Sequence, residues 1–171
     1  VVGYLPTPRV LFDLRLAMHI SAFAALAVLS FSASGQSPVI SEFLASNDDG
    51  IVDIDGDSSD WIEIHNPTSS TINLTNWHLT DDAADPFKWT FPSLNFPPGG
   101  FMIIFASSKD LTNPLDELHT NFKLSVDGEY LALTNPAGVA VSTEFAPTFP
   151  QQFEDVSYGF EFAPNLTGNE Y

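Results

Sequence analysis

The chain has 171 residues, and 22 Asp and Glu against 5 Lys and Arg give it a formal net charge of −17 at pH 7. A charge of this sign repels phosphate groups, so we expect no binding to nucleic acid and no direct binding to an anionic membrane surface. There is no cysteine, which excludes disulfides, thiolate metal sites and a cysteine nucleophile, while 44% hydrophobic residues suffice for one domain with a buried core.

Residues 1–35 have the pattern of a secretory signal peptide. Arg9 and Arg15 precede an apolar run, residues 16–31, and small residues follow, so we expect cleavage at the end of this leader. A membrane anchor is the alternative, but the run contains His19 and is shorter than the roughly 20 apolar residues of a spanning helix. We therefore expect a secreted or cell-surface protein with no stable membrane span after leader cleavage.

From Pro38 onward, apolar and polar residues alternate with the period of two that is typical of β-strands. Turn signals such as Asn66-Pro67, residues 97–100 (PPGG) and Asp127-Gly128 separate the segments, and no amphipathic helical pattern of useful length lies between them. We therefore predict an all-β fold, an antiparallel Greek-key β-sandwich. The predicted strands are residues 39–45, 61–65, 71–80, 87–91, 101–106, 121–125, 130–134 and 139–145.

Three segments in this order resemble the lamin-tail domain: residues 40–47 (ISEFLASN), 60–66 (DWIEIHN) and 73–81 (NLTNWHLTD). Two later segments, residues 96–106 (FPPGGFMIIFA) and 122–133 (FKLSVDGEYLAL), agree with it. The chain is most similar to the bacterial secreted type. The resemblance implies an immunoglobulin-like β-sandwich that serves as an interaction module and an accessory part of larger exported proteins. The nuclear roles of lamins are not implied, because this chain has a leader and no coiled-coil heptads.

These features divide the chain into a leader (residues 1–35), a lamin-tail-like sandwich domain (residues 36–160) and a linker or truncated tail (residues 161–171). We expect a non-catalytic extracellular binding or structural module within a larger exported protein. Its expected partner is a protein, a cell surface or an extracellular polymer. A carbohydrate-binding accessory domain of a secreted hydrolase is the alternative.

The segment 53–60 (DIDGDSSD) carries the candidate metal ligands, Asp53, Asp55, Asp57 and Asp60. Carboxylates that alternate on a loop with a glycine can converge on Ca²⁺, which takes about six to eight oxygen ligands. The glycine stands too early in this segment for an EF-hand loop. Alternatively, the aspartates form side-chain-to-backbone turns and cap the next strand. A second acidic loop, residues 81–85, is a weaker metal candidate.

The aromatic residues fit strand positions that face a core. Trp61, Trp77 and Trp89 are expected to pack inside the sandwich. The functional alternative is a sugar-stacking platform, which needs two such rings exposed on one face. Five phenylalanines near the C-terminus could cover a sheet edge or mark a partner surface: Phe145, Phe149, Phe153, Phe160 and Phe162.

Support for catalysis is weak. Glu63 and His65 share one face of a strand, and a glycosidase site would need a second carboxylate across the sheet. No G-x-S-x-G, glycine-rich phosphate loop or H-E-x-x-H pattern occurs, and the histidines show no metal-ligand spacing. The sequence therefore predicts a chain that is not an enzyme.

Overall fold

The computed structural model describes residues 37–159, which form eleven β-strands and, within this range, no helix. The strands are β1 Val39–Leu44, β2 Asp60–His65, β3 Ile72–Asn73, β4 His78–Thr80, β5 Trp89–Thr90, β6 Asn95–Phe96, β7 Phe101–Ala106, β8 Leu118–His119, β9 Leu131–Thr134, β10 Ala140–Phe145 and β11 Tyr158–Gly159. Within this range no helix could cross a membrane. The predicted leader and the predicted tail lie outside the described residues.

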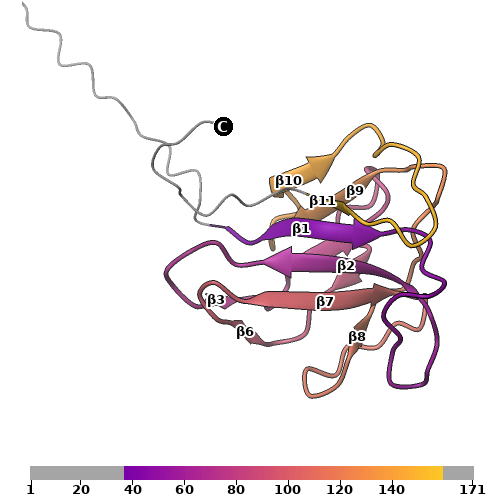
Figure 1. Ribbon diagram of the computed structural model, residues 1–171. Coiled ribbons are helices and arrows are strands. Elements are labelled where there is room, and N and C mark those ends of the chain that lie inside the picture. Colours follow the sequence, from indigo (N-terminus) through magenta and orange to yellow (C-terminus); the bar gives the residue numbers. More distant parts are fainter. Residues whose placement is uncertain (1–36, 160–171) are drawn as a thin grey trace, which may run out of the picture. The chain divides into compact units, whose positions relative to one another are not determined.

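The strands form a five-stranded sheet in the order β11-β1-β2-β7-β8 and a four-stranded sheet in the order β10-β9-β4-β5 (Figure 1). A small two-stranded sheet joins β3 and β6. Neighbouring strands are antiparallel except β7 and β8, which are parallel. The arrangement confirms the predicted all-β sandwich.

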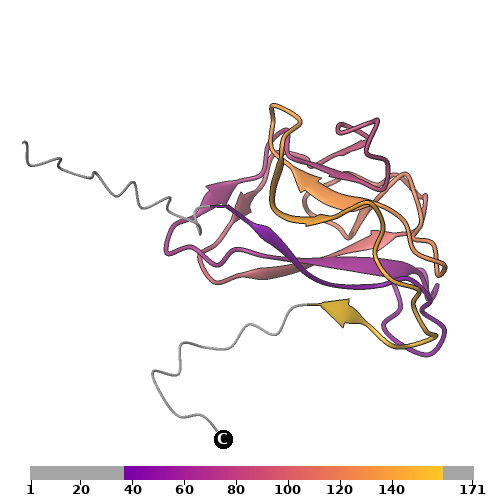
Figure 2. The same cartoon turned by 90° about the horizontal axis from the view of Figure 1, so that it is seen from above.

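The two larger sheets pack against each other around one hydrophobic core (Figure 2). Burial of each large apolar side chain contributes about 1.5–3 kcal/mol, so these residues supply most of the stabilisation. Fully buried core residues come from both sheets: Ile40, Phe43, Ile62, Ile64 and Ile104 from the first, and Leu79, Leu131 and Leu133 from the second.

The alternation within β2 also defines an outer face of the five-stranded sheet. Ile62 and Ile64 are completely buried, and their neighbours are half-buried because successive side chains point to opposite faces. The outer face carries Trp61, Glu63 and His65 of β2 beside Phe105, Ile103 and Phe101 of β7. This face does not contribute to the core between the sheets.

Asn66 directly follows β2, at the predicted Asn-Pro turn. Its buried amide donates hydrogen bonds to the carbonyl oxygens of Ser70 (2.9 Å), Phe96 (3.1 Å) and Pro97 (2.9 Å). Its Oδ1 accepts the N–H of Thr68. One side chain therefore joins the end of β2 to the turn that follows β6.

The segment before Gly159 returns to the edge of the first sheet, where β11 pairs with β1. Phe149 is buried with its ring centroid 4.7 Å from that of Phe43, and Tyr158 lies 5.6 Å from the same ring. Phe149 thus packs into the core beside this edge, whereas Phe153 is exposed. Two of the phenylalanines singled out in the sequence, at positions 160 and 162, lie outside the described residues.

Several strand bounds differ from the prediction. β7 coincides with the predicted strand 101–106, but the predicted strand 71–80 is divided into β3 and β4 by a turn in which Asn76 has φ +60°. The predicted strand 121–125 was wrong, because this segment contributes only a single bridge between Lys123 and Ser107. The two-residue strands β6, β8 and β11 lay outside the predicted strands.

Candidate functional site

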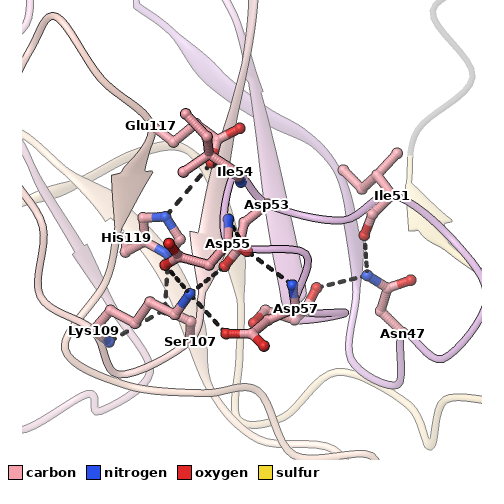
Figure 3. Close-up of polar contacts among 11 residues, drawn as sticks. Asn47, Ile51, Asp53, Ile54, Asp55, Asp57, Ser107, Lys109, Glu117 and His119 are labelled. Atoms are coloured by element: carbon pink, nitrogen blue, oxygen red, sulfur yellow. Dashed lines mark hydrogen bonds and ion pairs between the residues drawn. The ribbon is translucent and has the colours of Figure 1, made fainter.

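Three aspartates of the loop before β2 surround the ammonium group of Lys109 (Figure 3). Lys109 Nζ lies 2.5 Å from Asp53 Oδ2, 2.9 Å from Asp55 Oδ2 and 2.9 Å from Asp57 Oδ2. One carboxylate oxygen of each aspartate lies within 4.8 Å of those of the other two. We call these four residues the Lys109 clamp. The clamp joins the loop before β2 to the segment that follows β7.

The conformation of this loop follows from the Asp53 side chain, which is completely buried. Its Oδ1 accepts backbone hydrogen bonds from Asp55 N (3.0 Å) and Asp57 N (2.9 Å). Gly56 has φ +84°, a left-handed conformation that favours glycine. The alternative prediction of a side-chain-to-backbone turn is therefore confirmed for Asp53.

The charges in the clamp favour the ionised forms of both partners. Burial by itself raises the pKa of the Asp53 carboxyl, but the hydrogen bond from Lys109 and the backbone N–H groups lower it below its ordinary value. Hydrogen bonds to Asp53, Asp55 and Asp57 raise the pKa of Lys109 above its ordinary value. Lys109 is therefore a fixed cation at the position where converging carboxylates would hold a metal ion.

The structure brings together three of the four predicted metal ligands. Asp60 is separate, because it belongs to β2 and its Oδ2 accepts the backbone N–H of Leu124 at 3.1 Å. Burial raises the pKa of the Asp60 carboxyl. Alternation along β2 explains the separation, since Asp60 shares the inward face with Ile62. Calcium binding by Asp53, Asp55 and Asp57 stays a prediction, and the ion would have to displace the Lys109 ammonium.

The second acidic loop has a different arrangement. Asp81 Oδ1 forms an ion pair of 2.6 Å with Lys88, and Asp82 Oδ1 accepts the N–H of Ala84. Thr80 Oγ1 donates to the carbonyl oxygens of this loop. Within residues 37–159, the only group of three carboxylates with converging oxygens is the one in the Lys109 clamp.

A serine, a histidine and a glutamate lie beside the clamp. Ser107 Oγ is 2.9 Å from His119 Nδ1, and His119 Nε2 is 4.0 Å from Glu117 Oε2. These residue types occur together in hydrolases, but His119 is only 1% exposed and Ser107 Oγ accepts the N–H of Lys109. Glu117 Oε2 accepts the N–H of Ile54 at 2.7 Å. Glu117 therefore joins its loop to the loop before β2, and the Ser107–His119 pair joins the start of loop 107–117 to β8.

The predicted pair on β2 also makes internal contacts. Glu63 Oε1 accepts the hydroxyl of Ser41 at 2.6 Å, and Glu42 lies opposite it on β1. The His65 imidazole stacks on the exposed Phe101 ring with centroids 4.0 Å apart and an angle of 2°. No cleft or cavity is found in the described part of the chain.

The three tryptophans have different environments. Trp89 is buried in the core, and its ring packs edge-on against Phe91 at 4.8 Å. Trp77 is half-buried and packs against the core, as predicted. Trp61 differs from the prediction, because it lies half-buried on the outer face of the five-stranded sheet. The strand period assigns it there once the core positions of β2 are known.

Sequence reasoning missed the central residue of the site, Lys109. It lies 56 positions after Asp53, and no local pattern connects the two. The only available signal was that Lys109 is one of three lysines in a strongly acidic chain, where each cation has many carboxylates to contact. Ser107 and Glu117 carried no sequence signal either.

A family model described as Lamin Tail Domain matches residues 32–145. This range contains all strands from β1 to β10. No curated protein matches the chain.

Proposed function

Because the chain belongs to the lamin tail domain family, a family of non-enzymatic immunoglobulin-like domains, we propose that it is a non-catalytic protein-binding or structural module of a larger exported protein. The observation that carries the proposal is the extent of the family match, which includes every strand of the two large sheets except β11, together with the loops between β1 and β10. The burial of the Ser107–His119 pair supports the proposal, because His119 is only 1% exposed and offers a substrate little access.

Affinity capture tests the proposed binding role. The full chain, immobilised, is incubated with the exported protein fraction of its source cells and treated with a cross-linker, and retained proteins are identified by mass spectrometry. An immobilised unrelated protein of equal negative charge is the control. A protein retained by this chain and not by the control supports the module. Retention of the same proteins by both, or turnover of a substrate by the purified chain, would contradict it.

The extracellular location has its own experiment. Residues 1–35 are fused to a reporter enzyme that is active only outside the cytosol, and the N-terminus of the mature product is determined by mass spectrometry. We expect reporter activity and a new N-terminus directly after Gly35. An uncleaved, inactive fusion would remove the secretion proposal. Deletion of residues 16–31 provides the matched negative control.

Carbohydrate binding is the second candidate, and one observation favours it. The outer face of the five-stranded sheet carries Trp61 and the stacked pair His65 and Phe101, with the Glu63 carboxylate between them along β2. Aromatic rings with adjacent polar groups are typical of sugar sites. A glycan array with the unmodified chain, Phe101→Ala and the control Phe87→Ala tests it. Loss of a glycan signal in Phe101→Ala alone would support this candidate, and silence of the array would reject it.

A further inference from the structure

We infer that the loop end of the sandwich, formed by loops 45–59, 107–117 and 150–157, is a docking surface for a basic polypeptide segment that carries apolar side chains. The inference rests on the proposed binding function and adds the surface and the chemistry of the partner. It combines three observations: the loops are joined to one another, they expose apolar side chains, and their charge is almost entirely negative.

The strand register places the three loops at one end of the five-stranded sheet. Leu44, the last residue of β1, lies opposite Trp61 near the start of β2, and Asp60 lies opposite Ala106 at the end of β7. The start of β11 meets the same end of β1 through Tyr158. In Figure 1, loops 45–59 and 150–157 lie at the right of the view, and loop 107–117 runs from the right end of β7 to β8 below it.

Hydrogen bonds and ion pairs connect the loops to each other. Besides the Lys109 clamp, the Ile54 N–H donates to Glu117 Oε2 at 2.7 Å. The N–H of Asp48 donates to Asp155 Oδ1 at 2.8 Å, and the N–H of Asp155 donates to the Ser46 carbonyl oxygen at 2.9 Å. These contacts fix the loops before a partner arrives, which lowers the entropy cost of binding.

The fixed loops carry large apolar side chains in contact with water. Ile54 is 84% exposed, Leu115 is 90% exposed and Phe153 is 69% exposed. Twelve large apolar side chains are exposed among the residues with described burial, and seven of them lie on these three loops. This concentration at one end of the domain is typical of an interaction surface, whereas exposed apolar residues scattered singly are ordinary.

The charge of the loops defines the partner. They contain ten Asp and Glu residues and one basic residue, Lys109, whose ammonium is already held by three carboxylates. Such a surface attracts Lys and Arg and repels anionic lipid headgroups. It also repels a second copy of this chain. A polypeptide with both basic and apolar side chains complements the carboxylates and covers Ile54 and Leu115.

A titration followed by NMR tests the inference. A short peptide of lysine and leucine is added to the isotope-labelled full chain, with oligolysine, a peptide of glutamate and leucine, and phosphatidylcholine vesicles as comparisons. We expect amide shifts confined to the three loops, with tighter binding of the lysine–leucine peptide than of any comparison. Joint replacement Ile54→Ser and Leu115→Ser is expected to weaken binding by about tenfold, and the exposed control Val139→Ser is expected to leave it unchanged.

Four results would overturn the inference: no shift, shifts elsewhere on the sandwich, binding by oligolysine of equal strength, or equal binding by the variant and the unmodified chain. Preferential binding to the vesicles would identify a membrane surface and also overturn it. The affinity capture distinguishes failure of this inference from failure of the proposed binding function. If the chain with Ile54→Ser and Leu115→Ser still retains the same partners in the affinity capture, the binding function stands and this surface is not the binding site. If the unmodified chain retains no partner, the binding function itself is contradicted.

Discussion

Lys109 and Asp53 are 56 positions apart in the chain, and their side chains form an ion pair of 2.5 Å that connects two loops at one end of the sandwich. The two members have unequal surroundings. Asp53 is buried and accepts further hydrogen bonds from backbone N–H groups, whereas Lys109 is partly exposed. The loop therefore depends on the Asp53 carboxylate for its conformation and on Lys109 for its connection to the neighbouring loop.

Replacement Asp53→Ala is expected to lower the free energy of unfolding by roughly 1–3 kcal/mol, because the N–H groups of Asp55 and Asp57 lose their acceptor. Urea denaturation measures the change. The matched control is Asp48→Asn, an exposed carboxylate for which a change within about 0.5 kcal/mol is expected. Equal effects of the two substitutions would contradict the structural role of Asp53.

Removal of the Lys109 cation is expected to allow the loop before β2 to bind Ca²⁺ more strongly. In Lys109→Met, three carboxylates with converging oxygens lack a counter-charge, and Ca²⁺ would relieve their repulsion. We expect a rise in melting temperature on adding Ca²⁺ that is larger in Lys109→Met than in the unmodified chain. The further substitutions Asp55→Asn and Asp57→Asn should abolish the rise. No response in Lys109→Met would remove the calcium hypothesis.

Replacement Asn66→Ala is expected to destabilise the sandwich by roughly 2–4 kcal/mol. The buried amide satisfies three carbonyl oxygens, and alanine leaves them without this donor. The control is Asn121→Ala, because Asn121 is exposed and donates a single hydrogen bond, to the Lys88 carbonyl oxygen. Chemical denaturation of both variants gives the comparison, and a loss in Asn66→Ala no greater than in the control would contradict the role of Asn66.

Two glycines with positive φ are expected to respond differently to alanine. At Gly128 (φ +93°) a Cβ would lie 2.2 Å from the Phe149 carbonyl oxygen, whereas at Gly56 (φ +84°) no atom lies within 4 Å. Gly56→Ala should therefore cost about 1 kcal/mol from the backbone conformation alone. Gly128→Ala should cost considerably more, because backbone atoms must also move. Melting temperatures of the two variants in one buffer test the ranking, and a reversed order would contradict it.

The longer strands and the class of fold could be predicted from the sequence, because six residues are enough to show the alternation of apolar and polar side chains that is typical of a strand. The predicted strand 101–106 coincides with β7. A two-residue strand such as β6 or β8 has no period, and its pairing depends on a partner that is distant in the chain. The same limit explains segment 71–80, where local residues favour a strand and the turn at Asn76 interrupts it.

The three aspartates of the Lys109 clamp could be predicted from the sequence, whereas Lys109 could not. The spacing of Asp53, Asp55 and Asp57 indicated converging carboxylates, and the structure brings them together. Asp60 is near the other three aspartates in the sequence, but its position within a strand determines the direction of its side chain. Lys109 could not be found in this way, because the contact depends on the pairing of β2 with β7.

The pH dependence of stability is expected to follow three histidines, the buried His78 and His119 and the half-buried His65. Burial lowers the pKa of His65, His78 and His119 below the ordinary value of about 6.5. Just below that pH the unfolded chain binds protons that the native chain does not, so the free energy of unfolding rises with pH and falls on acidification.

Urea midpoints measured between about pH 5.5 and pH 7.5 test this expectation. The range avoids most of the opposite contribution of Asp60 and Glu129, whose pKa values are raised by burial and whose protonation at lower pH favours the native state. His119→Gln should reduce the slope, because it removes one of the three titrating groups. The substitution retains a polar side chain beside Ser107, so a loss of stability that is independent of pH can be separated from the change in slope. A midpoint that stays constant or increases as the pH is lowered through this range would contradict the assignment of neutral histidines to the native chain.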